Sequence, residues 1–275
     1  MTRGMNSRHF LILLYFLSLL LTLCQCTAMT IDVEAAKSKE VLEMGKKIKD
    51  RFKRWSFVFK ELGVKRAAEI GVWEGDFAHA VLSRVDSIEE YYLVDPWKHL
   101  QNWDKPFNKR DSEFNTVFIK AMKQSVESNE PWANKAKVLR GSSLDMASKV
   151  KDGSLDMVYI DGDHTARGTM IDLLKWFDKV RPGGLLCGDD FTDSFQHGKN
   201  FAPTFVKSVV SAFAEVHGLV VVEMGQLQWA MLKTSTSLSG DSGTKTNTRM
   251  KQIDSESDSI SKSESESKMS RLRTA

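Results

Sequence analysis

Short apolar runs alternate with amphipathic stretches between residues 63 and 233 of this chain. The apolar runs predict strands at residues 66–70, 91–94, 137–140, 155–160 and 184–187. The stretches between and after them predict helices at residues 76–84, 110–127, 166–180 and 201–217. Strands that alternate with helices are typical of βαβ units. The pattern therefore predicts an α/β domain with a Rossmann-like, doubly wound and mostly parallel sheet.

The end of this region changes character. Residues 219–224 and 227–232 are two apolar runs that flank Gly225-Gln226, which predicts two strands joined by a tight turn. We expect an antiparallel C-terminal hairpin to close the sheet, a feature that oxidoreductase Rossmann domains lack. The expected domain thus spans residues 63–233.

A helical segment is predicted before the domain. Residues 34–62 carry apolar positions at helical spacing, and Gly63 provides a stop. The Lys and Arg residues between positions 37 and 65 are interleaved with acidic and apolar residues, and the net charge is only +3. This pattern favours a solvated helix face over a nucleic-acid-binding surface.

The two ends of the chain differ in composition from the domain. Arg3 and Arg8 precede an apolar run at residues 10–24, which predicts a signal peptide or a signal anchor over residues 1–28. The expected location is therefore the secretory pathway, with membrane anchoring or organelle targeting as the alternatives. Residues 234–275 are rich in Ser, Thr, Lys and Glu and predict a disordered tail.

Acidic residues follow successive predicted strands. Glu69, Asp95, Asp161 and the pair Asp189-Asp190 each close or follow an apolar run. In an open parallel sheet, ligands bind at the carboxyl edge of the strands, so these acids should converge on one crevice. The sequence therefore predicts a ligand site at that edge.

The first predicted turn favours a nucleoside without a diphosphate. Glu69-x-Gly71-x-x-x-Gly75 lies between a strand and a helix, where glycines let the backbone approach a ligand. Trp73 stands where a dinucleotide fingerprint has its middle glycine, which disfavours a diphosphate and suits a cationic ligand. Asp95 lies twenty residues beyond Gly75, where an acid accepts the hydroxyls of a ribose.

Residues 65–233 resemble the class I S-adenosylmethionine-dependent methyltransferases, which have a seven-stranded sheet. Residues 94–97 (VDPW), 156–164 (DMVYIDGDH) and 181–191 (RPGGLLCGDDF) are most similar to the macrocin-type sugar O-methyltransferases. The resemblance implies that Glu69, Gly71 and Gly75 border the methionine part of S-adenosylmethionine. It also implies that Asp95 binds ribose and that Ser142 lies near adenine, although the family more often has Asp at that position.

Asp161 and the pair Asp189-Asp190, after the fourth and fifth predicted strands, could have either of two roles. Crowded carboxylates suit a hard cation such as Mg²⁺, Mn²⁺ or Ca²⁺, but each Asp is equally suited to cap the helix that follows it. Resemblance to metal-dependent O-methyltransferases implies the metal, most readily Mg²⁺, with Asp161, Asp189 and Asp190 as ligands. His164 follows Asp161 by three residues and is the predicted base, because imidazole titrates near neutral pH. Its alternative role is to orient Asp161 or Asp163.

The expected activity is divalent-metal-assisted O-methylation of a small-molecule or sugar hydroxyl, with Asp161 and His164 as catalytic residues. A metal-independent methyltransferase and a non-catalytic binding protein of the same fold are the alternatives. The loop at residues 97–107 and the side chains of Phe191, Phe195 and His197 are candidate walls for the acceptor. The acceptor itself and the oligomeric state are not predicted.

Overall fold

The computed structural model of the 275-residue chain describes residues 33–98, 111–127, 129–194 and 203–234. These residues all belong to one compact unit, Met1–Ser237. The predicted leader at residues 1–28 lies outside the described residues, and so does the predicted tail at residues 234–275 except for Thr234. So do most of the loop at residues 97–107, Phe195 and His197.

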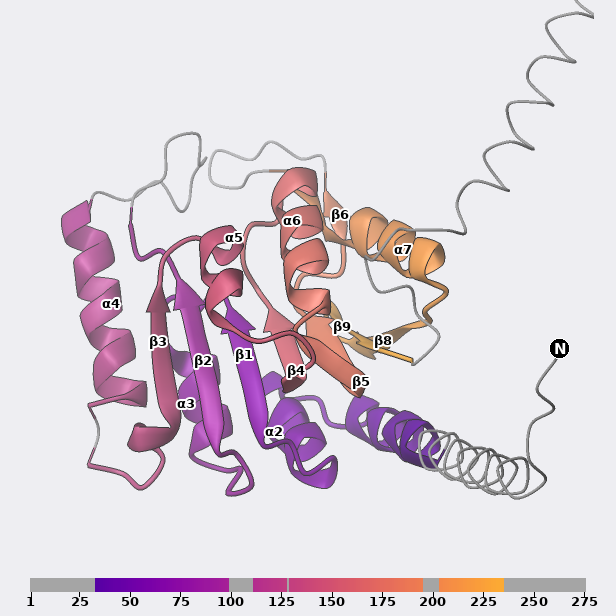
Figure 1. The fold of residues 1–275 in the computed structure, drawn as a ribbon, viewed down its shortest axis with the longest axis horizontal. Helices are drawn as coiled ribbons and strands as arrows, with labels where there is room; N and C mark the ends of the chain where they lie inside the picture. Colours follow the sequence, from indigo (N-terminus) through magenta and orange to yellow (C-terminus); the bar gives the residue numbers. More distant parts are fainter. Residues whose placement is uncertain (1–32, 99–110, 128, 195–202, 235–275) are drawn as a thin grey trace, which may run out of the picture. The chain divides into compact units, whose positions relative to one another are not determined.

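A seven-stranded sheet forms the centre of this unit, in the order β3-β2-β1-β4-β5-β9-β8 (Figure 1). Its strands are β1 (Arg66–Ile70), β2 (Glu90–Asp95), β3 (Ala136–Arg140), β4 (Leu155–Ile160), β5 (Val180–Gly188), β8 (Val221–Gly225) and β9 (Gln228–Leu232). Strands β1 to β5 pair in parallel, and β9 pairs antiparallel with both β5 and β8. The predicted Rossmann-like α/β sheet with a C-terminal antiparallel hairpin is confirmed.

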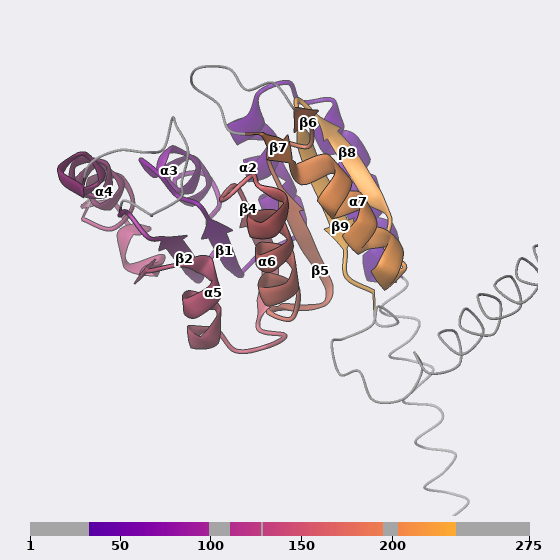
Figure 2. The same ribbon diagram turned by 90° about the horizontal axis from the view of Figure 1, so that it is seen from above.

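Helices cover both faces of the sheet (Figure 2). One face carries α2 (Arg51–Glu61), α3 (Asp76–Leu82) and α4 (Asp111–Ser125). The other carries α5 (Ser143–Met146), α6 (Ala166–Phe177) and α7 (Val206–His217). Short additional elements are the 3₁₀ turns η1 (Ala133–Lys135) and η2 (Ala147–Lys149) and the two-stranded pair β6 (Asp193–Ser194) and β7 (Thr204–Phe205).

The N-terminal helical segment consists of two helices. Residues 33–46 are helical, and α2 begins at Arg51 after a break. Asp50 caps α2, because its side chain accepts a hydrogen bond from the backbone N–H of Lys53 at 2.8 Å. The first residue of α2 after the break is Arg51, and its side chain contacts Asp161 and Asp189, which follow β4 and β5.

Alternate side chains of each parallel strand enter two separate hydrophobic cores. Ala67 and Met157 pack with α2, α3 and α4, whereas Ala68 and Val158 pack with α6 and α7. Strands buried on both faces are expected in a doubly wound sheet, and they explain the continuous apolar runs of the sequence. None of the helices within the described ranges is long and apolar enough to cross a membrane.

The strand register brings the predicted site residues to one level. Ile70 of β1 is paired with Val94 of β2 and with Ile160 of β4, and Ile160 is paired with Gly188 of β5. The residue that follows each of these four is, in turn, Gly71, Asp95, Asp161 and Asp189. The parallel pairing therefore places three acidic side chains and one glycine along a single edge.

Candidate functional site

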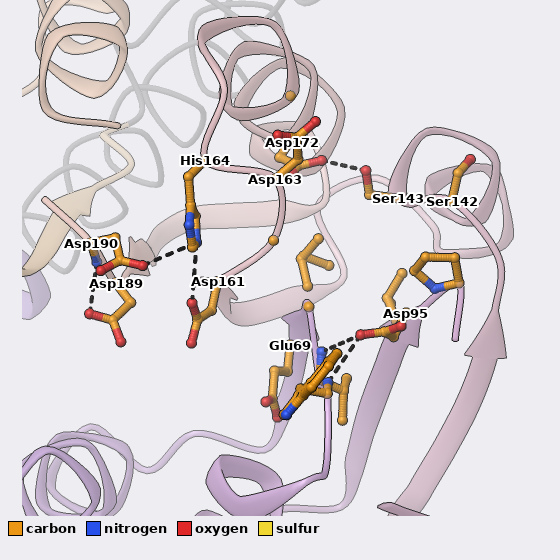
Figure 3. Close-up of a pocket in the computed structure, with 18 of the residues that line it drawn as sticks. Glu69, Asp95, Ser142, Ser143, Asp161, Asp163, His164, Asp172, Asp189 and Asp190 are labelled. Carbon is orange, nitrogen blue, oxygen red and sulfur yellow. Dashed lines mark hydrogen bonds and ion pairs between the residues drawn. The ribbon is translucent and has the colours of Figure 1, made fainter. Parts of the chain in front are cut away.

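A cavity of about 830 Å³ opens at this edge of the sheet. Its volume lies within the range that is usual for small-molecule sites. Every predicted site residue except Gly75 lines it, namely Glu69, Gly71, Asp95, Ser142, Asp161, His164, Asp189 and Asp190. Figure 3 shows His164 and the aspartates of β4 and β5 on one side of the cavity and Glu69 and Asp95 on another.

The turn after β1 needs its glycines. Gly71 has φ +88°, and a Cβ atom there would lie 2.0 Å from the backbone oxygen of Asp161. Gly75 has φ +85° and is the N-cap of α3, where an added Cβ would lie 3.1 Å from Cα of Ala121. Gly71 therefore lets the ends of β1 and β4 approach each other, while Gly75 lets α3 approach α4. Gly75 shapes the turn without lining the cavity.

Asp95 holds the same turn from the side. Its Oδ2 accepts hydrogen bonds from the backbone N–H groups of Val72 and Trp73, both at 3.0 Å (Figure 3). Its Oδ1 accepts one from the backbone N–H of Trp97 at 2.7 Å. Since a carboxylate oxygen accepts about two hydrogen bonds, Oδ2 is saturated and only Oδ1 keeps room for a further donor. Asp95 thus suits one ribose hydroxyl directly, rather than the expected two.

Trp73 and Trp97 both donate a backbone hydrogen bond to Asp95, and they also contact each other. Trp73 adopts the left-handed conformation with φ 54°, and its backbone oxygen accepts a hydrogen bond from the indole Nε1 of Trp97 at 2.8 Å. The Trp97 side chain is only 1% exposed and packs edge-on against Phe118, with ring centroids 5.0 Å apart. Trp97 is therefore part of the hydrophobic core and does not line the cavity, although it belongs to the loop that was a candidate wall for the acceptor. Phe191 is likewise buried in the other core.

Glu69 is a buried acid at the floor of the cavity. Its side chain is 2% exposed, and its Oε2 accepts a hydrogen bond from the hydroxyl of Tyr91 at 3.1 Å. Burial raises the pKa of Glu69 well above its ordinary value, and the Tyr91 bond opposes this only in part. A cationic group in the cavity would favour the ionised carboxylate, since an opposite charge offsets the cost of burial.

Ser142, Ser143 and Asp172 line a third part of the cavity (Figure 3). The Ser142 hydroxyl is the N-cap of α5, where it accepts from the backbone N–H of Asp145 at 3.1 Å and donates to its Oδ2 at 2.6 Å. The Ser143 hydroxyl donates to Asp172 of α6. Burial raises the pKa of Asp172 to about 7, and the Ser143 bond opposes this. The Ser142 hydroxyl thus has its one donor engaged and keeps one acceptor position for a ligand.

Asp161, His164 and Asp190 form the cluster that is best arranged for a metal ion. One ligand atom from each lies within 4.8 Å of the others. Nε2 of His164 lies 3.1 Å from Oδ2 of Asp190 and 3.6 Å from Oδ1 of Asp161. Burial lowers the pKa of His164, but the hydrogen bond with Asp161 and the charge of Asp190 outweigh this and raise it overall. Asp190 adopts the left-handed conformation, with φ 53°, a strained geometry often found at functional sites.

Asp189 points away from this cluster and into a network of side-chain hydrogen bonds. Its Oδ1 accepts from Nε2 of Gln228 on β9 and from the backbone N–H of Asp190, and its Oδ2 binds Arg51 of α2. Oε1 of Gln228 accepts from the Tyr159 hydroxyl at 2.6 Å and from the Trp55 indole at 2.8 Å. Burial and the charge of Asp161 raise the pKa of Asp189 to about 6. Two of the three predicted metal ligands thus lie together, and Asp189 lies beside them.

Arg51, Asp172 and Gln228 are site residues that the sequence pattern did not indicate. Each comes from an element other than the parallel strand ends, namely α2, α6 and β9. Arg51 and Asp172 line the cavity, and Gln228 supports Asp189 from beneath. The basic residues of the N-terminal segment were expected to be solvated. That expectation does not hold for Arg51, which pairs with two carboxylates.

A family model described as a methyltransferase domain matches residues 68–191. These residues therefore carry the sequence pattern of a methyltransferase domain, which confirms the resemblance at that level. The match does not distinguish the macrocin-type sugar O-methyltransferases. A comparison with curated proteins finds no match.

Solved structures offer distant similarities. The O-methyltransferase TomG from Streptomyces achromogenes, involved in tomaymycin synthesis and in complex with SAM, is 13% identical, with 74% of this chain and 90% of that chain covered and a TM-score of 0.47. A protein from Corynebacterium glutamicum is 14% identical, with 76% and 92% covered and a TM-score of 0.46. Cofactor-bound Rv0187 from MTB is 13% identical, with 72% and 88% covered and a TM-score of 0.43. These similarities are too distant to assign an activity.

Proposed function

We propose that this chain is an S-adenosylmethionine-dependent methyltransferase that methylates a hydroxyl of a small molecule or sugar with the help of a divalent cation. The observation that carries this proposal is the division of one cavity into two chemically different parts. A glycine turn held by Asp95 forms one part, and the cluster of Asp161, His164 and Asp190 forms the other. A methyl transfer needs a donor site and an acceptor site in one enclosure.

The residues present fit the cofactor. Glu69 is a buried acid that a cationic ligand would stabilise, and Asp95 has one acceptor position left for a ribose hydroxyl. The residues after β3 and the side chain of Asp172 would border the adenine. S-adenosylmethionine supplies an electrophilic methyl group, so the protein mainly has to align the acceptor oxygen with it and keep water out.

The residues at the ends of β4 and β5 also fit a divalent cation. Carboxylate oxygens of Asp161 and Asp190 are close enough to bind one ion together, and the imidazole of His164 lies beside both of them. Mg²⁺ prefers such oxygen ligands and usually keeps several waters, which leaves positions for acceptor hydroxyls. A bound cation would lower the pKa of a coordinated hydroxyl. In this proposal His164 accepts the proton, and Asp161 orients its ring.

A methyl-transfer screen over diols, sugars and catechols tests the proposal, with Mg²⁺ in one series and a chelator in the other. We expect turnover with at least one class of acceptor, and its loss with chelator. Asp161→Asn should reduce turnover by about a hundredfold or more, while the affinity for S-adenosylmethionine stays within a few fold. Turnover that persists in chelator would favour a metal-independent methyltransferase instead. Cofactor binding without turnover on any acceptor would favour a binding protein.

The predicted secretory location raises a question of cofactor supply, because S-adenosylmethionine is made in the cytosol. We propose that residues 1–28 direct the chain to a membrane-bound compartment or anchor it there. Microscopy of the full chain tagged at its C-terminus distinguishes these outcomes. A diffuse cytosolic signal would contradict both.

A further inference from the structure

Arg51 places a positive charge inside the acidic part of the cavity. It is the first residue of α2, a segment far in sequence from β4 and β5. Its Nη1 binds Oδ2 of Asp189 and lies 3.5 Å from Oδ2 of Asp161. The Arg51 side chain is 33% exposed and lines the cavity. The guanidinium therefore bridges carboxylates that follow two neighbouring strands, and one of them, Asp161, also belongs to the candidate metal cluster.

The surroundings hold Arg51 in this place. Its guanidinium carbon lies 5.1 Å from the ring centroid of Phe52 and 5.9 Å from that of Phe77. Cations are attracted to aromatic faces at such distances. Asp50 fixes the start of α2, and Gln228 orients Asp189 toward the guanidinium. Several independent contacts thus position the Arg51 side chain, in contrast to a long side chain that moves freely in solvent.

Arg51 offsets the repulsion between neighbouring carboxylates at this edge of the sheet. Three aspartates meet at the ends of β4 and β5, with His164 beside Asp161 and Asp190 and Arg51 beside Asp161 and Asp189. Carboxylates this close repel one another unless a cation lies between them. Arg51 supplies that cation from within the chain. A divalent ion that approaches Asp161 meets a fixed positive charge a few ångströms away and must either tolerate it or displace it.

We propose that Arg51 is a built-in competitor for the divalent cation, which occupies the carboxylates of Asp161 and Asp189 in the absence of metal and leaves them when a metal ion binds. This proposal rests on the metal-binding part of the proposed function. It makes Arg51 a residue that sets the metal concentration at which the site fills. It also explains how Asp189 becomes available as a third ligand, because its Oδ2 is released only when Arg51 moves.

The expected effect follows from population arithmetic. When a binding-competent state is populated in only a fraction of molecules, the apparent dissociation constant rises by the inverse of that fraction. If Arg51 occupies the carboxylates in about nine of ten molecules, its removal tightens metal binding by about tenfold. A bound cation that no longer feels the fixed positive charge gains further affinity in the same direction.

Titration of Mn²⁺ alone into the full chain, followed by electron paramagnetic resonance of the free ion, tests the proposal without any turnover. The variant is Arg51→Gln, and the matched control is Lys53→Gln on the same helix, which removes the same charge from an exposed side chain. We expect Arg51→Gln to bind Mn²⁺ about tenfold more tightly than the unaltered chain, and Lys53→Gln to bind it within about twofold of the unaltered chain. Thermal unfolding of each variant shows that the fold is kept.

The unaltered chain allows a second measurement that does not depend on how Arg51→Gln folds. Phenylglyoxal modifies accessible guanidinium groups, and mass spectrometry reports the rate at each arginine. We expect Mn²⁺ to increase the modification of Arg51 severalfold, while Arg167, also on the cavity wall, serves as the internal reference.

The outcomes separate the competitor role from the metal role. Equal Mn²⁺ affinity of Arg51→Gln and the unaltered chain, or unchanged Arg51 modification in Mn²⁺, overturns the competitor role and leaves the metal site standing. Weaker Mn²⁺ binding by Arg51→Gln would instead make Arg51 a supporting residue of the site, which also overturns it. Absence of Mn²⁺ binding in both chains overturns the metal part of the proposed function together with this inference.

Discussion

Asp95 binds the backbone of the turn that forms one part of the cavity. Its carboxylate accepts hydrogen bonds from the N–H groups of Val72, Trp73 and Trp97, all of which lie at or beside the cavity. An acid that organises three backbone donors affects both the shape of the pocket and its affinity. Under the proposed function, the loss of Asp95 should therefore reduce cofactor affinity by more than the loss of one contact with a ribose would.

Asp95→Ala tests this double role. The variant leaves three backbone N–H groups without their acceptor, so we expect the affinity for S-adenosylmethionine to fall by at least tenfold and the free energy of unfolding to fall by about 1–3 kcal/mol. Calorimetric titration and chemical denaturation measure the two effects. Asp86→Ala, at an exposed position, should change neither. A variant that loses affinity with full stability would show that Asp95 acts on the ligand alone.

Asp172 makes stability depend on pH. Burial raises its pKa to about 7, whereas the unfolded chain releases this proton near pH 4. Between these values the folded state binds more protons than the unfolded state, so the free energy of unfolding contributed by Asp172 falls as the pH rises from about 4 to about 7. The full effect of such a shift is on the order of 2–4 kcal/mol.

Asp172→Asn removes this titration while it keeps the shape of the side chain and an acceptor for the Ser143 hydroxyl. We expect the variant to be more stable than the unaltered chain at pH 8, with a difference that disappears toward pH 4. Denaturant unfolding at several pH values measures it. Parallel stability curves for the two chains would show that Asp172 has the same pKa in the folded and unfolded states, which would contradict the raised pKa.

Sequence reasoning identified the residues that follow directly on strand ends, because in a parallel sheet the strand order and chain direction alone bring Asp95, Asp161 and Asp189 to one edge. It did not identify Arg51 or Gln228. Their positions depend on how α2 and β9 pack on the sheet, and local patterns contain no signal for such contacts. The left-handed backbone at Asp190 likewise has no signal in the local sequence pattern.

At the scale of elements, the turn between β1 and α3 tolerates no side chain at position 71 without strain and collision. A side chain at position 71 would have to share space with the backbone of Asp161, in a conformation that already disfavours side chains. Gly153 also has a positive φ, +63°, but nothing lies within 4 Å of the place that a Cβ atom would take there. A substitution at Gly153 therefore tests backbone strain alone, whereas a substitution at Gly71 tests strain and steric collision together.

Gly71→Ala should lower the free energy of unfolding by more than about 3 kcal/mol, because strain and collision add together. Gly153→Ala should lower it by about 1–2 kcal/mol, from strain alone. Denaturant unfolding of both variants gives the comparison. Equal losses in the free energy of unfolding would mean that the ends of β1 and β4 separate easily. The close approach of these strands would then contribute little to stability.

The elements themselves were largely predictable. The predicted strands at residues 66–70 and 155–160 coincide with β1 and β4, because each is a short apolar run between clear turn signals. Strand β5 begins four residues earlier than predicted, at Val180, because Pro182 and two glycines obscure its start. The helix α5 and the β6–β7 pair were missed, since elements of two to four residues have no period to detect.

At the scale of the whole molecule, the described residues between 33 and 234 contain both hydrophobic cores. The segment from 235 to 275 has few apolar residues with which to add to them. A chain that ends at Thr234 should therefore unfold within about 2 °C of the full chain in a thermal scan. A decrease of more than about 5 °C would show that the C-terminal segment packs on the domain.

The proposed function depends above all on the identity of the ligand in the cavity. Calorimetric titration of the full chain with S-adenosylmethionine, and in parallel with NAD, tests it most directly. We expect S-adenosylmethionine to bind with a dissociation constant in the micromolar range, on the order of −8 kcal/mol, and NAD to give no heat. Binding of NAD without binding of S-adenosylmethionine would contradict the proposed function.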